Sequence, residues 1–406
     1  MRVLVLTYET PAYLAGGGPS RQHSLLEPLA DRNEIRVLST GGTPRLGRTP
    51  SGVDIRFIDP GAPAGHPDDG WVTKHLKHYR GADPWIHRPA THHRQALAAA
   101  LPGELEKFAP DIVVVEHGEL GPLLHRLPPE VGSVLVLHNI LLSVQAQKIL
   151  GAGAVGAANG LFELEVIARR ERADVGRASR VVVVTERDAR MVRLLNRRAD
   201  VTVVPNCVDT QYFRRRGPRA DRPTVVMTAS YQYPPNQWAV TELVDEVFPA
   251  VRRRVPDAEL VLVGQQMPPA LREHAEEQPG VRVVGEVDDI RPHLERAWVS
   301  VAPLRKGSGS PLKVIEALAT GVPVVGTPRV AGALGLRPGI DGILTGDRPP
   351  EMATAISTVL NDIGCRDRLA AAGELVARGR FDRTSASDLL ARVWADAADG
   401  RRSGSR

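Results

Sequence analysis

Short apolar runs alternate with amphipathic stretches along the whole chain of 406 residues. In the first half, the runs typical of buried strands are 2–7, 34–39, 53–58, 111–115, 133–137, 181–184 and 201–204. In the second half they are 224–229, 259–263, 281–286, 299–302 and 323–326. Helical patterns lie between many of them, at 20–31, 95–108, 161–177, 352–361 and 365–377. Apolar strands alternating with helices predict an α/β fold with parallel sheets buried on both faces.

The length of the chain predicts two domains, each large enough for its own core. We expect the first domain to span residues 1–210 and the second 211–380, with the polar, proline-containing stretch 214–222 as a linker. Both halves share a strand–loop–helix rhythm, which favours two Rossmann-like units. Residues 399–406 are expected to form a disordered tail.

Composition excludes several classes of function. Aromatic residues make up only 4% of the chain, so a stacking platform for single-stranded nucleic acid is not expected. The net charge of +5 comes from arginines scattered along the chain, so we expect no specific nucleic-acid binding. A weak attraction to anionic membrane surfaces remains open. Two cysteines far apart and no long apolar segment favour a cytoplasmic protein, with the inner face of the membrane as an alternative location.

The stretch 299–327 has the clearest chemistry. It reads as strand, glycine loop, helix, turn and strand. Ser310 has the chemistry of an N-cap, and Pro311 suits the first helical position. Leu312 begins the apolar face of this helix, and Gly321 is expected to end it.

Three cations gather at the start of that helix, although the helix dipole disfavours positive charge there. Lys313 lies in the first turn, and Arg305 and Lys306 lie just before it. Cations, a glycine loop and free helix amides together predict a phosphate or diphosphate site. Glu316, one turn further on, can accept hydrogen bonds from sugar or ribose hydroxyls. The alternative is a solvated ion pair between Lys313 and Glu316 on an ordinary helix.

Two histidines follow predicted strands in the first half. His117 follows the strand 111–115 and Glu116, and His138 follows the strand 133–137. Ligands bind at the carboxyl ends of strands in parallel α/β sheets, so these histidines are candidate site residues. Structural, hydrogen-bonded histidines are the alternative. Six further histidines lie in 59–94, but without metal-ligand spacing, so we expect a variable insertion that contacts the acceptor rather than a metal site.

The stretch 299–327 resembles the C-terminal signature of retaining glycosyltransferases of family 4. Glu316 and the residues up to Val325 match Glu-Ala-x-Ala-x-Gly-x-Pro-Val-Val. The first glutamate of the family signature is replaced by Ser308, as in a branch with a Gly-Ser-Gly-x-x-x-Lys loop. Residues 205–213 resemble a second family segment, Pro-Asn-Gly-Val-Asp-x-x-x-Phe.

The resemblance implies the GT-B fold, in which two Rossmann-like domains face each other across a deep cleft. Residues 381–398 would then form a helix that returns to the first domain. It also implies catalytic roles for His138, Lys306 and Lys313. The donor-binding residues would be Gly17, Gly18, Arg305, Ser308, Gly309, Ser310, Leu312 and Glu316. Glu116, His117 and Val287, the last in a loop beside the nucleotide base, are further candidates, and a plain flexible turn is the alternative for Gly17 and Gly18.

The activity implied is transfer of a sugar from a nucleotide-diphosphate sugar to a hydroxyl, with retention. Protein cations would neutralise the leaving diphosphate, so neither a metal nor a cofactor is expected beside the donor. Glycans, lipid-linked molecules and small molecules all fit as acceptors. Two alternatives keep the fold: a sugar-nucleotide 2-epimerase, and a non-catalytic protein that binds a sugar or a partner.

Overall fold

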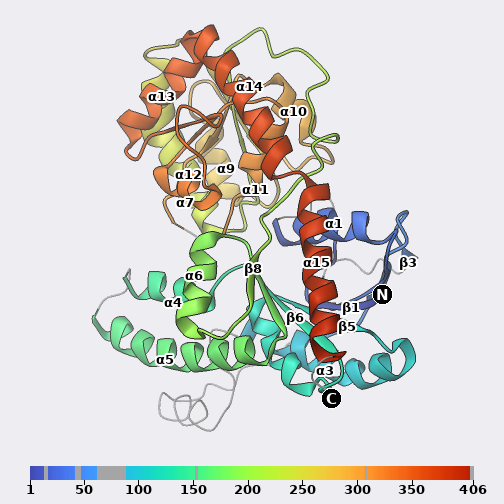
Figure 1. Cartoon of the computed structure of the whole chain (residues 1–406). Helices are drawn as coiled ribbons and strands as arrows, with labels where there is room; N and C mark the ends of the chain where they lie inside the picture. Colours follow the sequence, from blue (N-terminus) through green and yellow to red (C-terminus); the bar gives the residue numbers. More distant parts are fainter. Residues whose placement is uncertain (13–16, 42–46, 62–87, 151–153, 307–308, 403–406) are drawn as a thin grey trace. The chain divides into compact units, whose positions relative to one another are not determined.

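A computed structural model describes residues 1–12, 17–41, 47–61, 88–150, 154–306 and 309–402 of the chain. The chain divides into two compact units (Figure 1). The first comprises Met1–Ala12, Leu25–Pro205 and Ser387–Arg406, and the second comprises Tyr13–Ser24 and Asn206–Ala386. Each unit contains one sheet.

The sheet of the first unit has the strand order β3-β4-β2-β1-β5-β6-β7-β8. Its strands are β1 (Arg2–Thr7), β2 (Glu34–Ser39), β3 (Gly47–Arg48), β4 (Asp54–Phe57), β5 (Ile112–Glu116), β6 (Gly132–Leu137), β7 (Arg180–Val183) and β8 (Val201–Val203). All pairings are parallel except that of β3 with β4. The apolar runs predicted these strands because both faces of a parallel sheet are covered.

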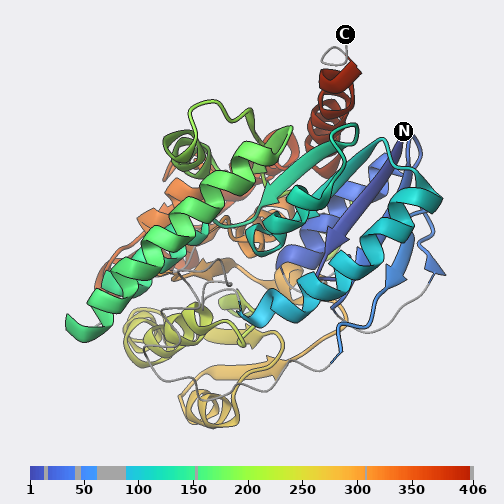
Figure 2. The same cartoon turned by 90° about the horizontal axis from the view of Figure 1, so that it is seen from below.

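Helices cover both faces of this sheet. They are α3 (Arg88–Phe108), α4 (Leu141–Leu150), α5 (Ala154–Arg177), α6 (Glu186–Leu195) and α15 (Arg383–Arg402), with 3-10 turns η1 (Glu27–Leu29) and η3 (Gly118–Arg126). Most of α1 (Gly17–Leu26) belongs to the second unit. Leu4 and Leu6 of β1 share a core cluster with Leu97 and Leu101 of α3. On the opposite face, the Gly132 position lies against the backbone of α15. α5 is the long green helix of Figure 1 and Figure 2.

The sheet of the second unit is parallel throughout, in the order β11-β10-β9-β12-β13-β14. Its strands are β9 (Thr224–Thr228), β10 (Glu259–Val263), β11 (Val281–Gly285), β12 (Val299–Ala302), β13 (Val324–Gly326) and β14 (Ile343–Thr345). Its helices are α7 (Pro234–Glu242), η4 (Leu243–Val247), α8 (Phe248–Arg252), α9 (Pro269–Glu276), α10 (Arg291–Arg296), α11 (Leu312–Ala319), α12 (Pro328–Leu334), α13 (Pro349–Asn361) and α14 (Ile363–Arg380). One continuous apolar core joins them.

Two expectations about the connections are wrong. The stretch 214–222 is packed within the second unit, since Arg215 donates to the Gly321 carbonyl and the Trp298 indole donates to the Ala220 carbonyl. Its proline and its charges suggested a linker, but these long-range hydrogen bonds cannot be read from local sequence. Residues 399–402 are not part of a disordered tail either, because α15 continues to Arg402 through an alanine-rich segment that favours helix.

None of the helices in the described part of the chain combines the length and apolarity needed to cross a membrane.

Candidate functional site

Each sheet has a switch point, where the order of the strands reverses. In the first unit it lies between β1 and β5, and in the second between β9 and β12. Loops that leave the carboxyl ends of two such strands diverge to opposite faces and leave a crevice between them, where ligands bind in this class of fold. Gly17, Gly18 and His117 follow β1 or β5, and Arg305, Lys306 and Lys313 follow β12, whereas His138 follows β6, the strand beside β5.

In the second unit, the loop after β12 leads into α11. Gly309 has a φ of +79°, in the left-handed region that favours glycine. α11 begins at Leu312, and Pro311 is its N-cap, with no side-chain cap. The expectation that Ser310 caps the helix and Pro311 opens it is therefore wrong by one residue. The extended backbone of Pro311, with ψ 110°, delays the first helical turn.

Lys313 lies in the first turn of α11, and its Nζ donates to Oδ1 of Asn236 at 2.9 Å. Burial lowers the pKa of Lys313 to about 8, against the opposing effect of Glu316. Burial likewise raises the pKa of Glu316 to about 7, against the effect of Lys313. Such dominant burial does not fit the alternative of a solvated surface ion pair.

The other two cations are held in different ways. The Arg305 guanidinium forms a two-point ion pair with Glu242, with both N–O distances 2.7 Å, and lies 3.3 Å from Asp347. The Lys306 ammonium lies 4.9 Å from the centre of the Trp238 ring, within cation–π range. Arg305 is thus already charge-compensated, and its role as a phosphate ligand stays a prediction. Ser308, the residue at the place of the family's first glutamate, lies outside the described residues.

Two hydrogen bonds through Asn206 connect α1 with the loop between β12 and α11. Arg21 is buried and donates to Oδ1 of Asn206 at 3.0 Å, and Nδ2 of Asn206 donates to the Ser310 carbonyl at 2.6 Å. Residues 17–24, including Gly17 and Gly18, belong to the second unit and not, as expected, to the first. Among the described residues, apart from its chain neighbours and the backbone of its own helix, nothing lies within 4 Å of a Cβ built at Gly17.

Two further candidates belong to the second unit. Leu312 is the first residue of α11 and is buried in the apolar core. Val287 follows β11 and packs partly buried against the same core. The proposed roles of both toward the donor stay predictions.

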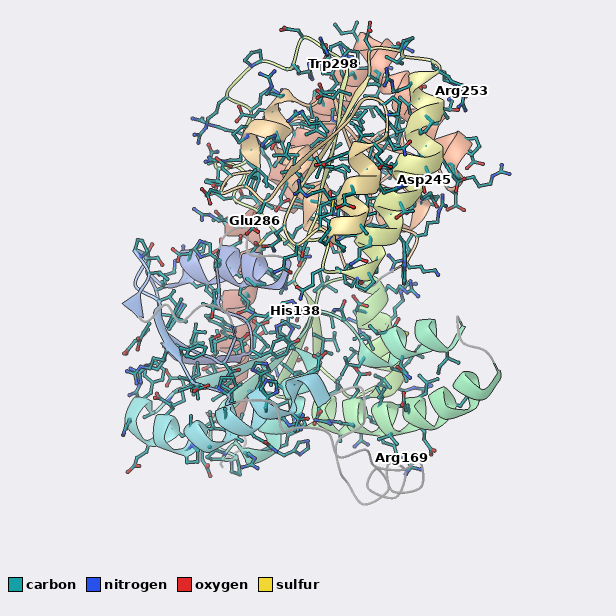
Figure 3. The ribbon with its side chains drawn as sticks, turned by 180° about the vertical axis from the view of Figure 1, so that it is seen from behind. His138, Arg169, Asp245, Arg253, Glu286 and Trp298 are labelled. Atoms are coloured by element: carbon teal, nitrogen blue, oxygen red, sulfur yellow. The ribbon has the colours of Figure 1, made fainter. Side chains whose placement is uncertain are left out.

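In the first unit, three rings stack at the switch point. The Tyr8 and His117 rings lie 4.3 Å apart, and His117 and His138 lie 4.2 Å apart. Two carboxylates flank the stack, with Glu9 Oε2 at 3.2 Å from His117 Nε2 and Glu116 Oε2 at 2.6 Å from His138 Nε2. The structure thus brings together Glu116, His117 and His138, and adds Tyr8 and Glu9. His138 is labelled in Figure 3.

The environment of this ring stack shifts the charge states of its members. Burial alone would lower the pKa of His117, but the close contact with the Glu9 carboxylate and the charges of nearby glutamates raise it overall. Burial would raise the pKa of Glu9, yet the close contact with His117 and its charge lower it. His117 therefore favours the protonated form and Glu9 the ionised form. The φ of His117 is +74°, a strained value for a non-glycine residue that turns its ring into the stack.

Sequence reasoning missed Tyr8, Glu9 and Asn236. Tyr8 and Glu9 directly follow β1, so the rule that selected His117 and His138 would also have found them. Asn236 had no comparable signal, because its partner Lys313 is 77 residues away in the chain. Within the described residues, no group of three or more His, Cys, Asp or Glu side chains is arranged to hold a metal ion; independence of metal stays a prediction.

Two family models match the chain. Residues 15–212 match "Glycosyltransferase Family 4", and residues 222–362 match "Glycosyl transferases group 1". A phosphatidyl-myo-inositol mannosyltransferase of Mycobacterium tuberculosis is 31% identical over 209 residues, which cover 48% of this chain and 54% of the relative. A protein of the same name from Mycolicibacterium smegmatis is 31% identical over 206 residues, covering 48% and 52%. The chain spans about half the length of the curated relatives it matches.

Solved structures resemble this fold over nearly the whole chain. Sucrose-phosphate synthase from Thermosynechococcus elongatus has a TM-score of 0.74 at 16% identity, covering 97% of this chain and 98% of the other. Anabaena HepE in complex with UDP-glucose has a TM-score of 0.66 at 16% identity, covering 97% and 99%. At such identities the likeness shows the fold alone. With both family models and the fold in agreement, the chain belongs to the GT-B glycosyltransferases of the family 4 type.

Proposed function

We propose that the protein transfers a sugar from a nucleotide-diphosphate sugar to a hydroxyl acceptor, with retention at the anomeric carbon. The observation that carries this proposal is the switch point of the second unit. There, Lys306 lies in the loop before α11 and the half-buried Lys313 lies in its first turn, and the amides at a helix N-terminus also favour an anion. A diphosphate gains negative charge as the glycosidic bond breaks, so fixed cations stabilise the transition state more than the bound substrate.

Each remaining group has a proposed role. Glu316, one turn from Lys313, would accept hydrogen bonds from ribose hydroxyls. His138, held by Glu116 at 2.6 Å, would contact the donor sugar. Gly17 and Gly18 would admit the donor close to the backbone, and the charge of the lysines would replace that of a metal ion. The names of the relatives support testing mannose as the sugar and a lipid-linked hydroxyl as the acceptor before glycans and small molecules.

The proposal is tested by turnover of a panel of nucleotide sugars, including UDP-glucose and GDP-mannose, with release of the nucleoside diphosphate as the signal. We expect one donor to be turned over by the natural protein and not by Lys313→Ala. Lys107→Ala is the matched control, because Lys107 is exposed at the end of α3, among the residues of the first unit. Equal turnover by Lys313→Ala and Lys107→Ala would contradict the proposed diphosphate site.

A further inference from the structure

Helix α7 contacts all three cations around the proposed diphosphate site, each through a different side chain. The pairs are Asn236 with Lys313, Trp238 with Lys306, and Glu242 with Arg305. The three cations come from the loop after β12 and from α11, far along the chain, whereas their three partners all belong to one short helix. The contacts bring the loop after β9 and the loop after β12 together at the switch point.

We propose that α7 is the positioning element of the anion site, and that Asn236 is the positioning residue that holds the Lys313 ammonium in place. This inference rests on the proposed function only for the identity of the anion. The hydrogen bond between Lys313 and Asn236 is an observation that does not depend on that identity.

Asn236 is suited to this task because both ends of its amide are engaged. Its Nδ2 donates to the Ser230 carbonyl at 2.7 Å, which leaves Oδ1 directed at Lys313 Nζ at 2.9 Å. The side chain is 6% exposed and lies in the first turn of α7, so it has little freedom to turn away. A lysine side chain is long and flexible, and an anchored acceptor removes much of that freedom before a ligand arrives.

The chemistry of the acceptor also matters. A neutral amide oxygen orients an ammonium group without cancelling its charge, so Lys313 keeps a full positive charge for an anion. Glu242 acts differently on the same helix, since its carboxylate neutralises Arg305 in a two-point ion pair. The side chains of α7 therefore affect the two cations differently. Glu242 neutralises the charge of Arg305, whereas Asn236 leaves the charge of Lys313 available to a ligand.

The test follows the side-chain signals of lysine by NMR in protein labelled with 13C- and 15N-lysine. The chain has only six lysines, and Lys313→Arg assigns the signal of interest. We compare Asn236→Leu, which removes the acceptor, with Asn236→Asp, which places a carboxylate against the ammonium. Both variants lose the donor to Ser230, so a merely structural disturbance would move the Lys313 titration the same way in both.

We expect opposite shifts. Asn236→Leu should lower the pKa of Lys313 because the ammonium loses a partner, and Asn236→Asp should raise it by about one unit or more. Gln237→Leu is the matched control, since Gln237 donates to the neighbouring Tyr231 carbonyl at 2.7 Å and should leave Lys313 unchanged. An unchanged titration in the Asn236 variants, or shifts of the same sign, overturns the inference. If the leucine variant does not fold, a raised pKa in Asn236→Asp beside an unchanged one in Gln237→Leu decides it.

Adding UDP or GDP to the same samples separates this inference from the proposed function. We expect nucleoside diphosphate to shift the Lys313 signal in the natural protein, and Asn236→Leu to weaken that binding about tenfold, as for loss of a hydrogen bond to a charged group. If Lys313 responds to the Asn236 variants but to neither nucleotide, the positioning role stands and the donor assignment falls. If nucleotide shifts Lys313 equally in the natural protein and in Asn236→Leu, the positioning role falls.

Discussion

The two units place very different chemistry at the same point of the same kind of sheet. At the switch point of the first unit, Tyr8, His117 and His138 form a ring stack edged by two glutamates. At the switch point of the second unit, Lys306 before α11 and Lys313 in its first turn each contact a side chain of α7. The strand order creates a crevice in each case, but the loop residues decide what can bind there.

The difference suggests a division of labour. Rings and carboxylates that hydrogen-bond to each other suit neutral sugar hydroxyls, whereas fixed cations suit a diphosphate. The charges agree with this division. Lys306 and Lys313 bring positive charge to the proposed diphosphate site, whereas each imidazole of the ring stack is paired with a carboxylate. Substitutions in the two sites should therefore have different effects on turnover and on the binding of nucleoside diphosphate.

The largest effect is expected for Lys313→Ala. Losing a cation aimed at the leaving group should lower kcat about 10²- to 10³-fold. The measurement is single-turnover release of nucleoside diphosphate, with Lys107→Ala as the control. A loss confined to KM would mean that Lys313 binds ground state and transition state equally well.

The pH dependence of turnover should report the same lysine. With a pKa of about 8, Lys313 carries its charge below that pH and loses it above, so kcat should fall up to tenfold per pH unit beyond about pH 8. Lys313→Arg keeps the charge at all these pH values, and its profile should lack the alkaline fall. The same fall in Lys313→Arg would assign it to another group.

A smaller effect is expected in the first unit for Glu116→Gln. The amide can still contact His138 Nε2 but cannot hold it with a charge, so we expect kcat/KM to fall about tenfold while binding of free nucleoside diphosphate is unchanged. His138→Ala should match or exceed that loss. If Glu116→Gln weakens nucleoside diphosphate binding as strongly as turnover, the two sites do not divide the work as described.

Glu316→Gln should change stability in a pH-dependent way. The folded pKa of Glu316 is about 7, above the usual 4.5, so the folded protein binds more protons than the unfolded chain between those values. The stability that this carboxyl contributes in its neutral form is therefore lost as pH rises from 4.5 to 7. Urea unfolding from pH 5 to 7 should show that loss, on the order of 2 kcal/mol, in the natural protein and little of it in Glu316→Gln. Parallel curves for the two proteins would contradict the shifted pKa.

The smallest effect is expected for Arg305→Ala. Glu242 already compensates this guanidinium, so we expect turnover to fall by no more than about threefold, through a less well held loop. Glu242→Gln frees the charge of Arg305 and serves as the comparison. A loss in Arg305→Ala as large as in Lys313→Ala would restore Arg305 as a direct phosphate ligand.

Much of the fold follows from sequence because its signals are local. Apolar runs predicted the parallel strands, and Gly321 was expected to end α11. That helix ends at Ala319, with Gly321 at a φ of +67°. Such signals depend on neighbouring residues and on backbone preferences that any chain shares. The fold class was predictable for the same reason.

The side-chain contacts within the sites were less predictable, because they depend on the order of the strands in the sheet. Lys313 contacts Asn236, and Arg305 contacts Glu242, because β9 and β12 are neighbours in the sheet. Residues 17–24 belong to the second unit, where Arg21 donates to Asn206, a residue 185 positions away in the chain. Local sequence carries no record of contacts over such separations.

Equilibrium binding of free nucleoside diphosphate to three variants tests the central claim most directly. Calorimetric titration of UDP and GDP compares the natural protein with Lys306→Ala, Lys313→Ala and His138→Ala. We predict that one nucleotide binds the natural protein and His138→Ala alike and binds both lysine variants at least tenfold more weakly. Undiminished binding in the lysine variants together with loss of binding in His138→Ala would contradict the account.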